Sequence, residues 1–225
     1  MPSSILNQLI ESGVFRDFPQ DAKEKLAKIS ITKTCSDGQV IYQNGDASDA
    51  LYGVLTGGVK ISAEDANGKY YLYGVSQPGL WFGEISALDG QPRAQTAIAS
   101  GQTSLLKVPR NGLLELLDNE PILYKYFMKV FCRRLRHAGQ ILEESAFLPV
   151  SKRIAKQLLR QHKITQRHNV KLNQEELAAS LGVTRQSVHR VLKDWQLNQW
   201  ISVSYGNVEV LKVDALETFL DLSGE

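Results

Sequence analysis

The sequence has few of the residues from which disulfide frameworks and metal centres are built. Its 225 residues include two cysteines, Cys35 and Cys132, which lie far apart along the chain. A disulfide framework, a zinc site or an iron–sulfur cluster needs more cysteines or closer ones, so we read both as buried apolar residues. The four histidines form no metal-spaced cluster with acids, and no nucleophile motif appears. An enzyme is therefore not expected.

Long apolar runs are also missing. No run approaches the roughly 18 residues of a membrane span, and the amino-terminal stretch MPSSILNQLIES lacks the basic region and long apolar segment of a secretion signal. The apolar share of 43% is ordinary for a globular protein, and 225 residues suffice for one large domain or two small ones. We expect a cytoplasmic protein with no membrane partner.

One stretch of the chain is poor in acids. The net charge is only +2, and residues 1–149 carry 15 basic and 16 acidic side chains. Between residues 151 and 193, however, there are ten basic residues and only two acids, Glu175 and Glu176. A local excess of this size is expected of a surface that meets phosphates. The alternative, a solvated basic face, is equally compatible with the charge alone.

Two kinds of pattern divide the first half of the chain. Residues 5–29 have the apolar spacing of a helix around a start signal at Asp17 to Asp21. From Thr32 to Val108, short β-rich runs alternate with turns such as NGD, GG, ANGK and QPG; the runs are QVIYQ, ALYGVLTGGVKIS, YYLYGV, AQTAIAS and TSLLKV. Many short strands with glycine at the corners predict a barrel or roll rather than a parallel sheet.

A long helix is predicted from Tyr124 onwards. Apolar residues recur there at alternating intervals of four and three, at Tyr124, Met128, Phe131, Leu135, Ala138 and Leu142. This spacing is the seam of a coiled coil, and neighbouring arginines keep the seam narrow. We expect a parallel homodimer, although a helix packed on its own domain would suit the same residues. Pro149 disfavours helical geometry at Leu148, so a hinge and domain boundary are predicted there.

The segment LNQEELAASLGVTRQSVHRVLKDW has the signals of two short helices joined by a tight turn. Asn173 is a good N-cap, and Glu176 can complete a capping box. Gly182 suits the left-handed end of the first helix, and Thr184 caps the second. Such a pair is the helix–turn–helix motif that reads DNA. The helix SKRIAKQLLRQ and the strand NVKLN precede it, and the hairpin WISVSYGNVEVL, turning at residues 205–207, follows as a wing.

The second helix of this motif separates an apolar stripe from a polar face. The stripe contains Val188, Val191, Leu192 and Trp195 at helical spacing. The first turns of a recognition helix reach base edges, where arginine binds guanine and glutamine binds adenine. We predict DNA contacts from Thr184, Arg185, Gln186, Ser187, His189 and Arg190. The alternative is an ordinary amphipathic surface helix.

Two points within this prediction stay open. His189 is as well suited to a phosphate or a water molecule as to a base. Further candidates for phosphate contacts are Lys152, Arg153, Lys156 and Lys171, and the alternative for them is simple solvation.

The stretch FGEISALDGQPRAQTA, residues 82–97, combines one acid beside a glycine with one arginine nine positions later. Residues 84–88 are long enough for one helical turn, whose N–H groups favour a phosphate. Arg93 offers a planar fork for phosphate oxygens, whereas Glu84 would repel a phosphate and suits a sugar hydroxyl. One anion and one hydroxyl describe a cyclic nucleotide. The alternative is an internal ion pair between Glu84 and Arg93 that closes a β-turn.

This stretch resembles the phosphate-binding cassette of cyclic-nucleotide-binding domains, with Gly-Glu at its start and Pro-Arg-Ala near its end. The alanine matches the form found in protein-kinase regulatory subunits. The resemblance implies that Glu84 binds the ribose 2′-OH, that Arg93 binds the cyclic phosphate, and that the next residue contributes backbone. The predicted ligand-binding residues are Gly83, Glu84, Ile85, Ser86, Arg93 and Ala94.

The resemblance extends over most of the chain. IYQNGDASDALYGVLTGGVKIS, AFLPVSKRIAKQLL and LGVTRQSVHRVLKDW are similar to the early roll, the hinge with its first DNA-domain helix, and the recognition element of the Crp/Fnr family. Ala138 and Gly139 depart from the Thr–Ser pair with which the family's cyclic AMP receptor contacts adenine. Gln186 replaces a glutamate that accepts from cytosine there, so the DNA half-site should differ.

The resemblance implies an α+β fold in three parts: a cyclic-nucleotide-binding β-roll (a double-stranded β-helix) over residues 1–120, a dimerisation helix and hinge over 121–148, and a winged helix–turn–helix over 149–225. We expect a homodimeric transcription regulator that binds palindromic double-stranded DNA, contacts RNA polymerase, and responds to cyclic AMP or, less favoured, cyclic GMP. No metal ion, haem or iron–sulfur cluster is expected, although His137 leaves haem as an alternative. A second alternative is a regulator of the same fold whose roll is structural or senses a different effector.

Overall fold

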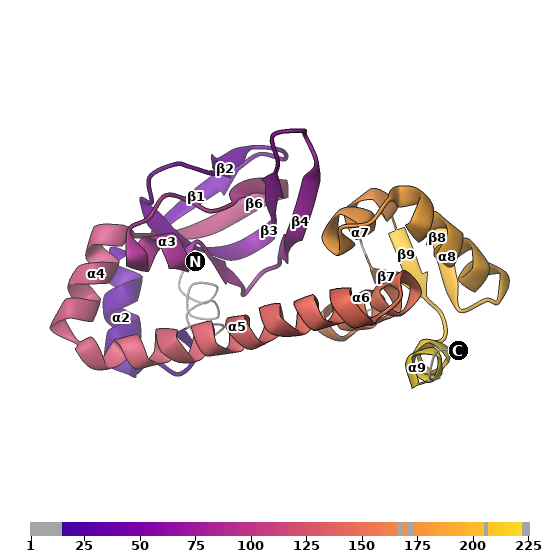
Figure 1. Cartoon of the computed structure of the whole chain (residues 1–225). Helices are drawn as coiled ribbons and strands as arrows, with labels where there is room; N and C mark the ends of the chain where they lie inside the picture. Colours follow the sequence, from indigo (N-terminus) through magenta and orange to yellow (C-terminus); the bar gives the residue numbers. More distant parts are fainter. Residues whose placement is uncertain (1–14, 166–168, 171–172, 205–206, 222–225) are drawn as a thin grey trace. The chain divides into compact units, whose positions relative to one another are not determined.

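A computed structural model describes residues 15–165, 169–170, 173–204 and 207–221 (Figure 1). The chain forms two compact units, Met1–Leu135 and Arg136–Glu225. Of the helical pattern predicted over residues 5–29, the structure contains α2, Gln20–Ile29, and residues 5–14 lie outside the described part. None of the described helices is long and apolar enough to span a membrane.

The first unit is built on an antiparallel sheet with the strand order β1-β6-β3-β4. The short strand β2 pairs with β6, and β5 pairs with β3. The strands are β1 (Ile31–Cys35), β2 (Val40–Tyr42), β3 (Ala50–Glu64), β4 (Tyr70–Ser76), β5 (Trp81–Phe82) and β6 (Thr96–Pro109). The two runs predicted around residues 94–108 thus form one strand, β6, which pairs with β3 along most of its length. Antiparallel pairing with glycine at the turns agrees with the predicted roll.

Two hydrophobic clusters hold the first unit together. Helices α2, α4 (Arg110–Asn119) and η2 (Pro121–Leu123) and the start of α5 (Tyr124–Phe147) enclose one of them, in which Phe15 lies edge-on to Trp81 at 4.5 Å and to Phe127 at 5.8 Å. The other fills the roll and includes Tyr42, Tyr52 and Phe82, so it lies directly beneath the predicted cassette. Aromatic pairs in these edge-on geometries add stability beyond the area that they bury.

The second unit contains the predicted helix–turn–helix. Its elements are α6 (Val150–Thr165), β7 (Asn169–Val170), α7 (Gln174–Leu181), α8 (Arg185–Leu197), β8 (Ile201–Ser204), β9 (Asn207–Val210) and α9 (Val213–Asp221). The capping box of Asn173 and Glu176, the left-handed Gly182 (φ 64°) and the Thr184 cap are all present. Strands β7, β9 and β8 form a small antiparallel sheet. Together with the first unit, this confirms the predicted α+β class.

Three features differ from the sequence-based description. Helices α4 and α9 were not anticipated; the N-cap of α4 is Pro109, which provides no side-chain cap, so the usual start signal is missing. The interpretation of both cysteines as buried is wrong for Cys132, which is exposed on α5, while Cys35 is buried. Cys132 shares a face of α5 with Met128 and Leu135, which are 61% and 76% exposed. Helix α5 ends at Phe147 and α6 begins at Val150, but the two compact units divide earlier, between Leu135 and Arg136. The hinge and domain boundary at Pro149 stay a prediction.

Candidate ligand-binding and DNA-binding sites

The carboxylate of Glu84 is buried at the start of the predicted cassette. Glu84 is the first residue of α3 (Glu84–Asp89), which follows β5 directly, and it is 1% exposed. One oxygen, Oε1, forms an ion pair with Arg134 of α5. The other, Oε2, has no hydrogen-bond donor among the described residues. Burial raises the pKa of Glu84, and the positive charge of Arg134 only partly offsets this effect.

The guanidinium of Arg93 is buried a short distance away along the same segment. Nη1 donates to the Gly83 carbonyl at 2.9 Å, and Nη2 donates to Asp49 Oδ1 at 3.0 Å and to the Ala50 carbonyl at 2.5 Å. Arg93 is 2% exposed, and its Nε has no partner in the described chain. A guanidinium has five N–H donors, so two of them, including Nε, remain available for a ligand.

Gly83 is required by its backbone conformation and by the space around it. Its φ of 82° lies in the left-handed region that favours glycine. A Cβ at this position would stand 2.7 Å from Arg93 Nη1. The absence of a side chain at residue 83 therefore lets the arginine reach the carbonyl of the same residue.

The remaining predicted ligand residues differ in their surroundings. Ser86 is buried, and its hydroxyl donates to the Pro92 carbonyl at 3.2 Å, which ties the segment together. Ile85 is 47% exposed. Ala94 is exposed, and its carbonyl accepts from Asn44 Nδ2 at 2.9 Å. No backbone acceptor in the described chain takes the amide N–H of Ser86 or Ala94, as expected for Ser86 in the first turn of a helix.

The structure does not contain the ion pair that was the alternative explanation of this segment. Glu84 pairs with Arg134, and Arg93 pairs with Asp49. Asp49 also accepts from Lys107 at 2.8 Å and from the Tyr52 hydroxyl at 3.0 Å. Sequence reasoning missed Asp49 and Arg134. No local signal singled them out, because both are distant in sequence from their partners.

The polar face of α8 is available to a partner molecule. Val188, Leu192 and Trp195 are buried, while Arg185, Gln186 and Arg190 are exposed. The last three have no side-chain hydrogen bond or ion pair with any described residue. Thr184 and Ser187 bond to each other at the start of the helix, with their hydroxyl oxygens 2.9 Å apart. His189 Nδ1 lies 3.2 Å from Gln174 Oε1 of α7.

The predicted phosphate contacts outside α8 are mostly engaged within the chain. Lys152 donates to the Leu220 carbonyl at 3.0 Å, and Arg153 donates to the Leu181 carbonyl. Lys156 donates to Glu144 at 3.1 Å. Lys171 lies outside the described residues. The three described side chains therefore make contacts within the second unit, and their role as phosphate contacts stays a prediction.

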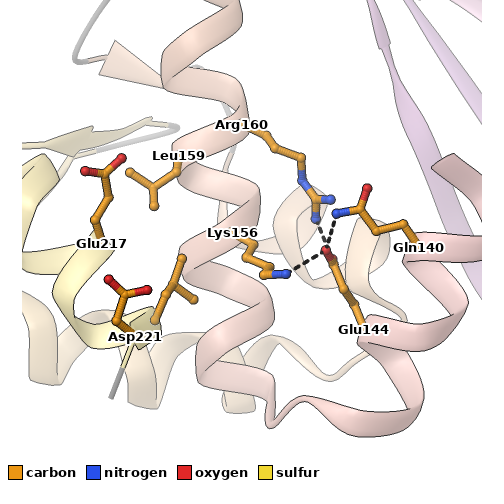
Figure 2. A pocket seen from close by; sticks show the side chains of 8 residues that line it. Gln140, Glu144, Lys156, Leu159, Arg160, Glu217 and Asp221 are labelled. Carbon is orange, nitrogen blue, oxygen red and sulfur yellow. Dashed lines mark hydrogen bonds and ion pairs between the residues drawn. The ribbon is translucent and has the colours of Figure 1, made fainter. Parts of the chain in front are cut away.

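A pocket of about 390 Å³ lies in the second unit, lined by Gln140, Glu144, Lys156, Leu159, Arg160, Glu217, Leu220 and Asp221. In Figure 2, Gln140, Lys156 and Arg160 point toward the carboxylate of Glu144, at 3.0, 3.1 and 2.9 Å. Burial by itself would raise the pKa of Glu144, but the Lys156 hydrogen bond and the charge of Arg160 outweigh it and hold this pKa below its usual range. Both cations of this pocket are thus already paired with a carboxylate of the same chain.

Possible metal ligands were compared across the described part of the chain. No group of three or more His, Cys, Asp or Glu side chains there is arranged to hold a metal ion. The functional candidates are therefore the charged cassette of the first unit and the exposed face of α8.

Comparison with known proteins places each candidate site within a matched domain. Residues 32–120 match the cyclic nucleotide-binding domain family, and residues 152–219 match the Crp-like helix-turn-helix domain family. The chain is 31% identical over 180 residues to the cyclic AMP receptor protein of Thermus thermophilus, which covers 80% of this chain and 83% of that protein. It is 28% identical over 203 residues to the CRP-like cAMP-activated global transcriptional regulator of Mycobacterium tuberculosis, covering 86% and 89%.

The known structures lead to the same class. A solved CRP/FNR-family transcriptional regulator from Thermus thermophilus is 27% identical, with a TM-score of 0.71 over 86% of this chain and all of the other. The chain belongs to the Crp/Fnr family of transcription regulators. It is a DNA-binding regulator with a cyclic-nucleotide-binding domain, and the family's regulators are generally not enzymes.

Proposed function

We propose that the protein is a homodimeric transcription regulator controlled by a cyclic nucleotide bound in the roll of the first unit. One observation carries this proposal: of the two buried charged groups of the cassette, one has a hydrogen-bond donor without a partner and the other has an acceptor without a partner. Arg93 retains free donors, including Nε, and Glu84 retains a free acceptor, Oε2. A buried polar atom without a partner costs about 1–3 kcal/mol. A ligand with one anion and one hydroxyl would satisfy both groups.

A cyclic nucleotide has this composition. Arg93 and the amide N–H groups of Ser86 and Ala94 would hold the cyclic phosphate, and Glu84 would accept from the ribose 2′-OH. Gly83 and Ile85 would contribute closely placed backbone. The relatives named for cyclic AMP favour that nucleotide. Ala138 and Gly139 have no side-chain hydroxyl that could bind a base and so distinguish adenine from guanine. Cyclic GMP must therefore be tested beside cyclic AMP.

The ion pair between Glu84 and Arg134 would link the ligand to α5. A ribose hydroxyl that donates to Glu84 changes the surroundings of Arg134, and Arg134 belongs to the helix that carries the predicted dimer seam. Three apolar residues of that seam, Met128, Leu135 and Leu142, are 61%, 76% and 71% exposed in the single chain. A second copy would cover them. The ligand can shift an equilibrium between two dimer states only by its different affinity for those states.

In the proposed dimer, each α8 would read one half of a palindromic site. Two recognition helices that enter successive major grooves lie about 34 Å apart. Arg185, Gln186 and Arg190 are the exposed candidates for base or phosphate contacts, with Thr184, Ser187 and His189 beside them. The division into residues 1–120, 121–148 and 149–225 is part of this proposal, and RNA polymerase is the expected further partner.

Calorimetric titration of the full chain with cyclic AMP and with cyclic GMP tests the ligand. We expect the wild-type protein to bind at least one of them and Arg93→Ala to lose at least about tenfold in affinity, since hydrogen bonds to charged groups contribute about 1.5–3 kcal/mol. Arg93→Lys keeps the charge without the fork and should lie between the two. Lys107→Ala is the matched control, because it removes the other cation that binds Asp49. We expect that control to keep its affinity within about threefold.

Two outcomes would contradict the proposal. If the wild-type chain binds neither nucleotide at millimolar concentration, the roll is structural or senses another effector. If Arg93→Ala and Lys107→Ala lose affinity equally, the effect arises from disturbing the environment of Asp49 and not from a lost ligand contact.

A further inference from the structure

A tyrosine outside the predicted site lies against its arginine. Tyr42, the last residue of β2, is 8% exposed. Its ring centroid is 4.2 Å from Cζ of Arg93, and the ring of Tyr52 is 5.7 Å from the same atom. A cation–π contact is stronger when both groups are shielded from water, as they are here. The ring of Tyr42 therefore helps to fix the orientation of the guanidinium.

The hydroxyl of Tyr42 lies close to Gly83 and to the guanidinium of Arg93. The position that a Cβ on Gly83 would occupy lies 2.7 Å from Arg93 Nη1 and 3.5 Å from the Tyr42 hydroxyl. The guanidinium nitrogen and the phenol oxygen therefore both lie on the side of Gly83 where another residue would carry its side chain. A phosphate oxygen that accepts from the guanidinium beside Gly83 would lie close to the phenol.

The hydroxyl also lacks a partner of its own. It makes no hydrogen bond with any described residue, whereas the hydroxyl of neighbouring Tyr52 binds Asp49 at 3.0 and 3.1 Å. A phenol hydroxyl without a partner can donate to a ligand. Burial raises the pKa of Tyr42 to about 12, so the hydroxyl keeps its proton at neutral pH and can donate it in a hydrogen bond.

We propose that Tyr42 is a ligand-contacting residue of the roll, whose ring holds the Arg93 guanidinium and whose hydroxyl donates a hydrogen bond to an exocyclic oxygen of the bound cyclic phosphate. This inference rests on the proposed function. Tyr42 adds a neutral donor to the charge of Arg93, and both groups lie beside Gly83.

Titration of full-length variants with cyclic AMP tests the two roles separately. Tyr42→Phe keeps the ring and should bind about 10- to 100-fold more weakly, as expected for a lost hydrogen bond to a charged group. Tyr42→Leu also loses the ring contact and should bind more weakly still. Tyr73→Phe is the control, because Tyr73 is a 58% exposed tyrosine on β4. Its affinity should equal that of the wild type.

Phosphorothioate analogues of cyclic AMP provide a readout that a purely structural role would not change. The Rp and Sp isomers carry sulfur, a weaker acceptor, in place of one or the other exocyclic oxygen. The wild-type protein should discriminate against the isomer whose sulfur faces Tyr42, and Tyr42→Phe should lose that part of the discrimination. Hydrogen exchange of the β2 and β6 amides should be unchanged in Tyr42→Phe, because the hydroxyl has no partner in the described chain.

Each other outcome overturns the inference. If Tyr42→Phe binds cyclic AMP within twofold of the wild type and keeps the same isomer preference, the hydroxyl does not touch the phosphate, and the proposed function stands. If its affinity falls while exchange in β2 and β6 accelerates, the role of Tyr42 is structural. If the wild-type protein binds no cyclic nucleotide, the proposed function is wrong, and so is this inference, which depends on it.

Discussion

Replacing Gly83 by alanine tests the geometry of the cassette directly. The new Cβ would meet Arg93 Nη1 at 2.7 Å, in a backbone conformation with φ of 82°. The left-handed conformation costs a residue with a Cβ roughly 1–2 kcal/mol, and overpacking typically costs about 1–3 kcal/mol. The two effects together predict that Gly83→Ala destabilises the first unit by about 2–5 kcal/mol.

The steric part of this cost depends on how firmly Arg93 is held. Nη1 is the end of a long side chain, which could ordinarily move aside at little cost. Here three hydrogen bonds, the Tyr42 ring and almost complete burial hold the guanidinium in place. Restoring an ordinary contact requires Nη1 to move by several tenths of an ångström, so the cyclic-nucleotide affinity should also fall by at least about tenfold.

Gly101→Ala separates the two effects. Gly101 has a similar φ of 74°, but a Cβ there would find no atom within 4 Å. Gly101→Ala should therefore lower the free energy of unfolding only by the backbone contribution, about 1–2 kcal/mol, and should keep its ligand affinity. Hydrogen exchange of β3 and β6 amides reports the local unfolding free energy of this sheet apart from the second unit. Equal destabilisation of the two variants, with equal ligand affinity, would show that Arg93 moves freely and would refute the reasoning.

Three further predictions concern stability, assembly and DNA. The pKa of Glu84 is raised, so relative to Glu84→Gln the wild type should lose stability as pH rises from about 4. The pKa of Glu144 is lowered, so relative to Glu144→Gln the wild type should lose stability as pH falls below about 5. Local hydrogen exchange in each unit between pH 4 and 7 measures both trends, and trends of the same sign would contradict them. Leu135→Glu should lower the dimer fraction in sedimentation, whereas Leu197→Glu, at an equally exposed leucine outside the seam (76% for each), should not; equal behaviour of the two would argue against the seam. Arg185→Ala should weaken binding to the preferred site by about 1–3 kcal/mol and relax one guanine position in a selection from random duplexes, and a selection that returns no palindrome would contradict the symmetric dimer.

The helix–turn–helix was predictable in detail because its signals are local. The Asn173 capping box, the left-handed Gly182 and the Thr184 cap each act over three or four residues. The same locality explains the success with α3, where a glycine at each end sets the limits of the helix. Helix α4 was missed because it begins after a proline without a side-chain cap. Its position is instead set by burial of Leu113, Leu116 and Leu117 against the first core cluster.

The candidate site was predictable only in part. The order of Glu84 and Arg93 along the chain indicated an anion and a hydroxyl, and the structure buries both side chains. Their partners could not be read from that order. Tyr42 also gave no signal in the sequence, because an aromatic residue in a β-rich run is expected to fill a core, and Tyr42 does so while contacting Arg93.

The sequence by itself determined the local elements: the capped helices of the DNA-reading motif, the apolar seam of α5 and the residues of the cassette. Only the tertiary structure decided which charge meets which. Arg93 binds Asp49 at a separation of 44 residues, and Glu84 binds Arg134 on a helix outside the roll. The physical reason is that caps, turns and apolar periodicity act between near neighbours along the chain. A buried charge instead takes whatever opposite charge the fold brings within a few ångströms, and no residue spacing encodes that choice.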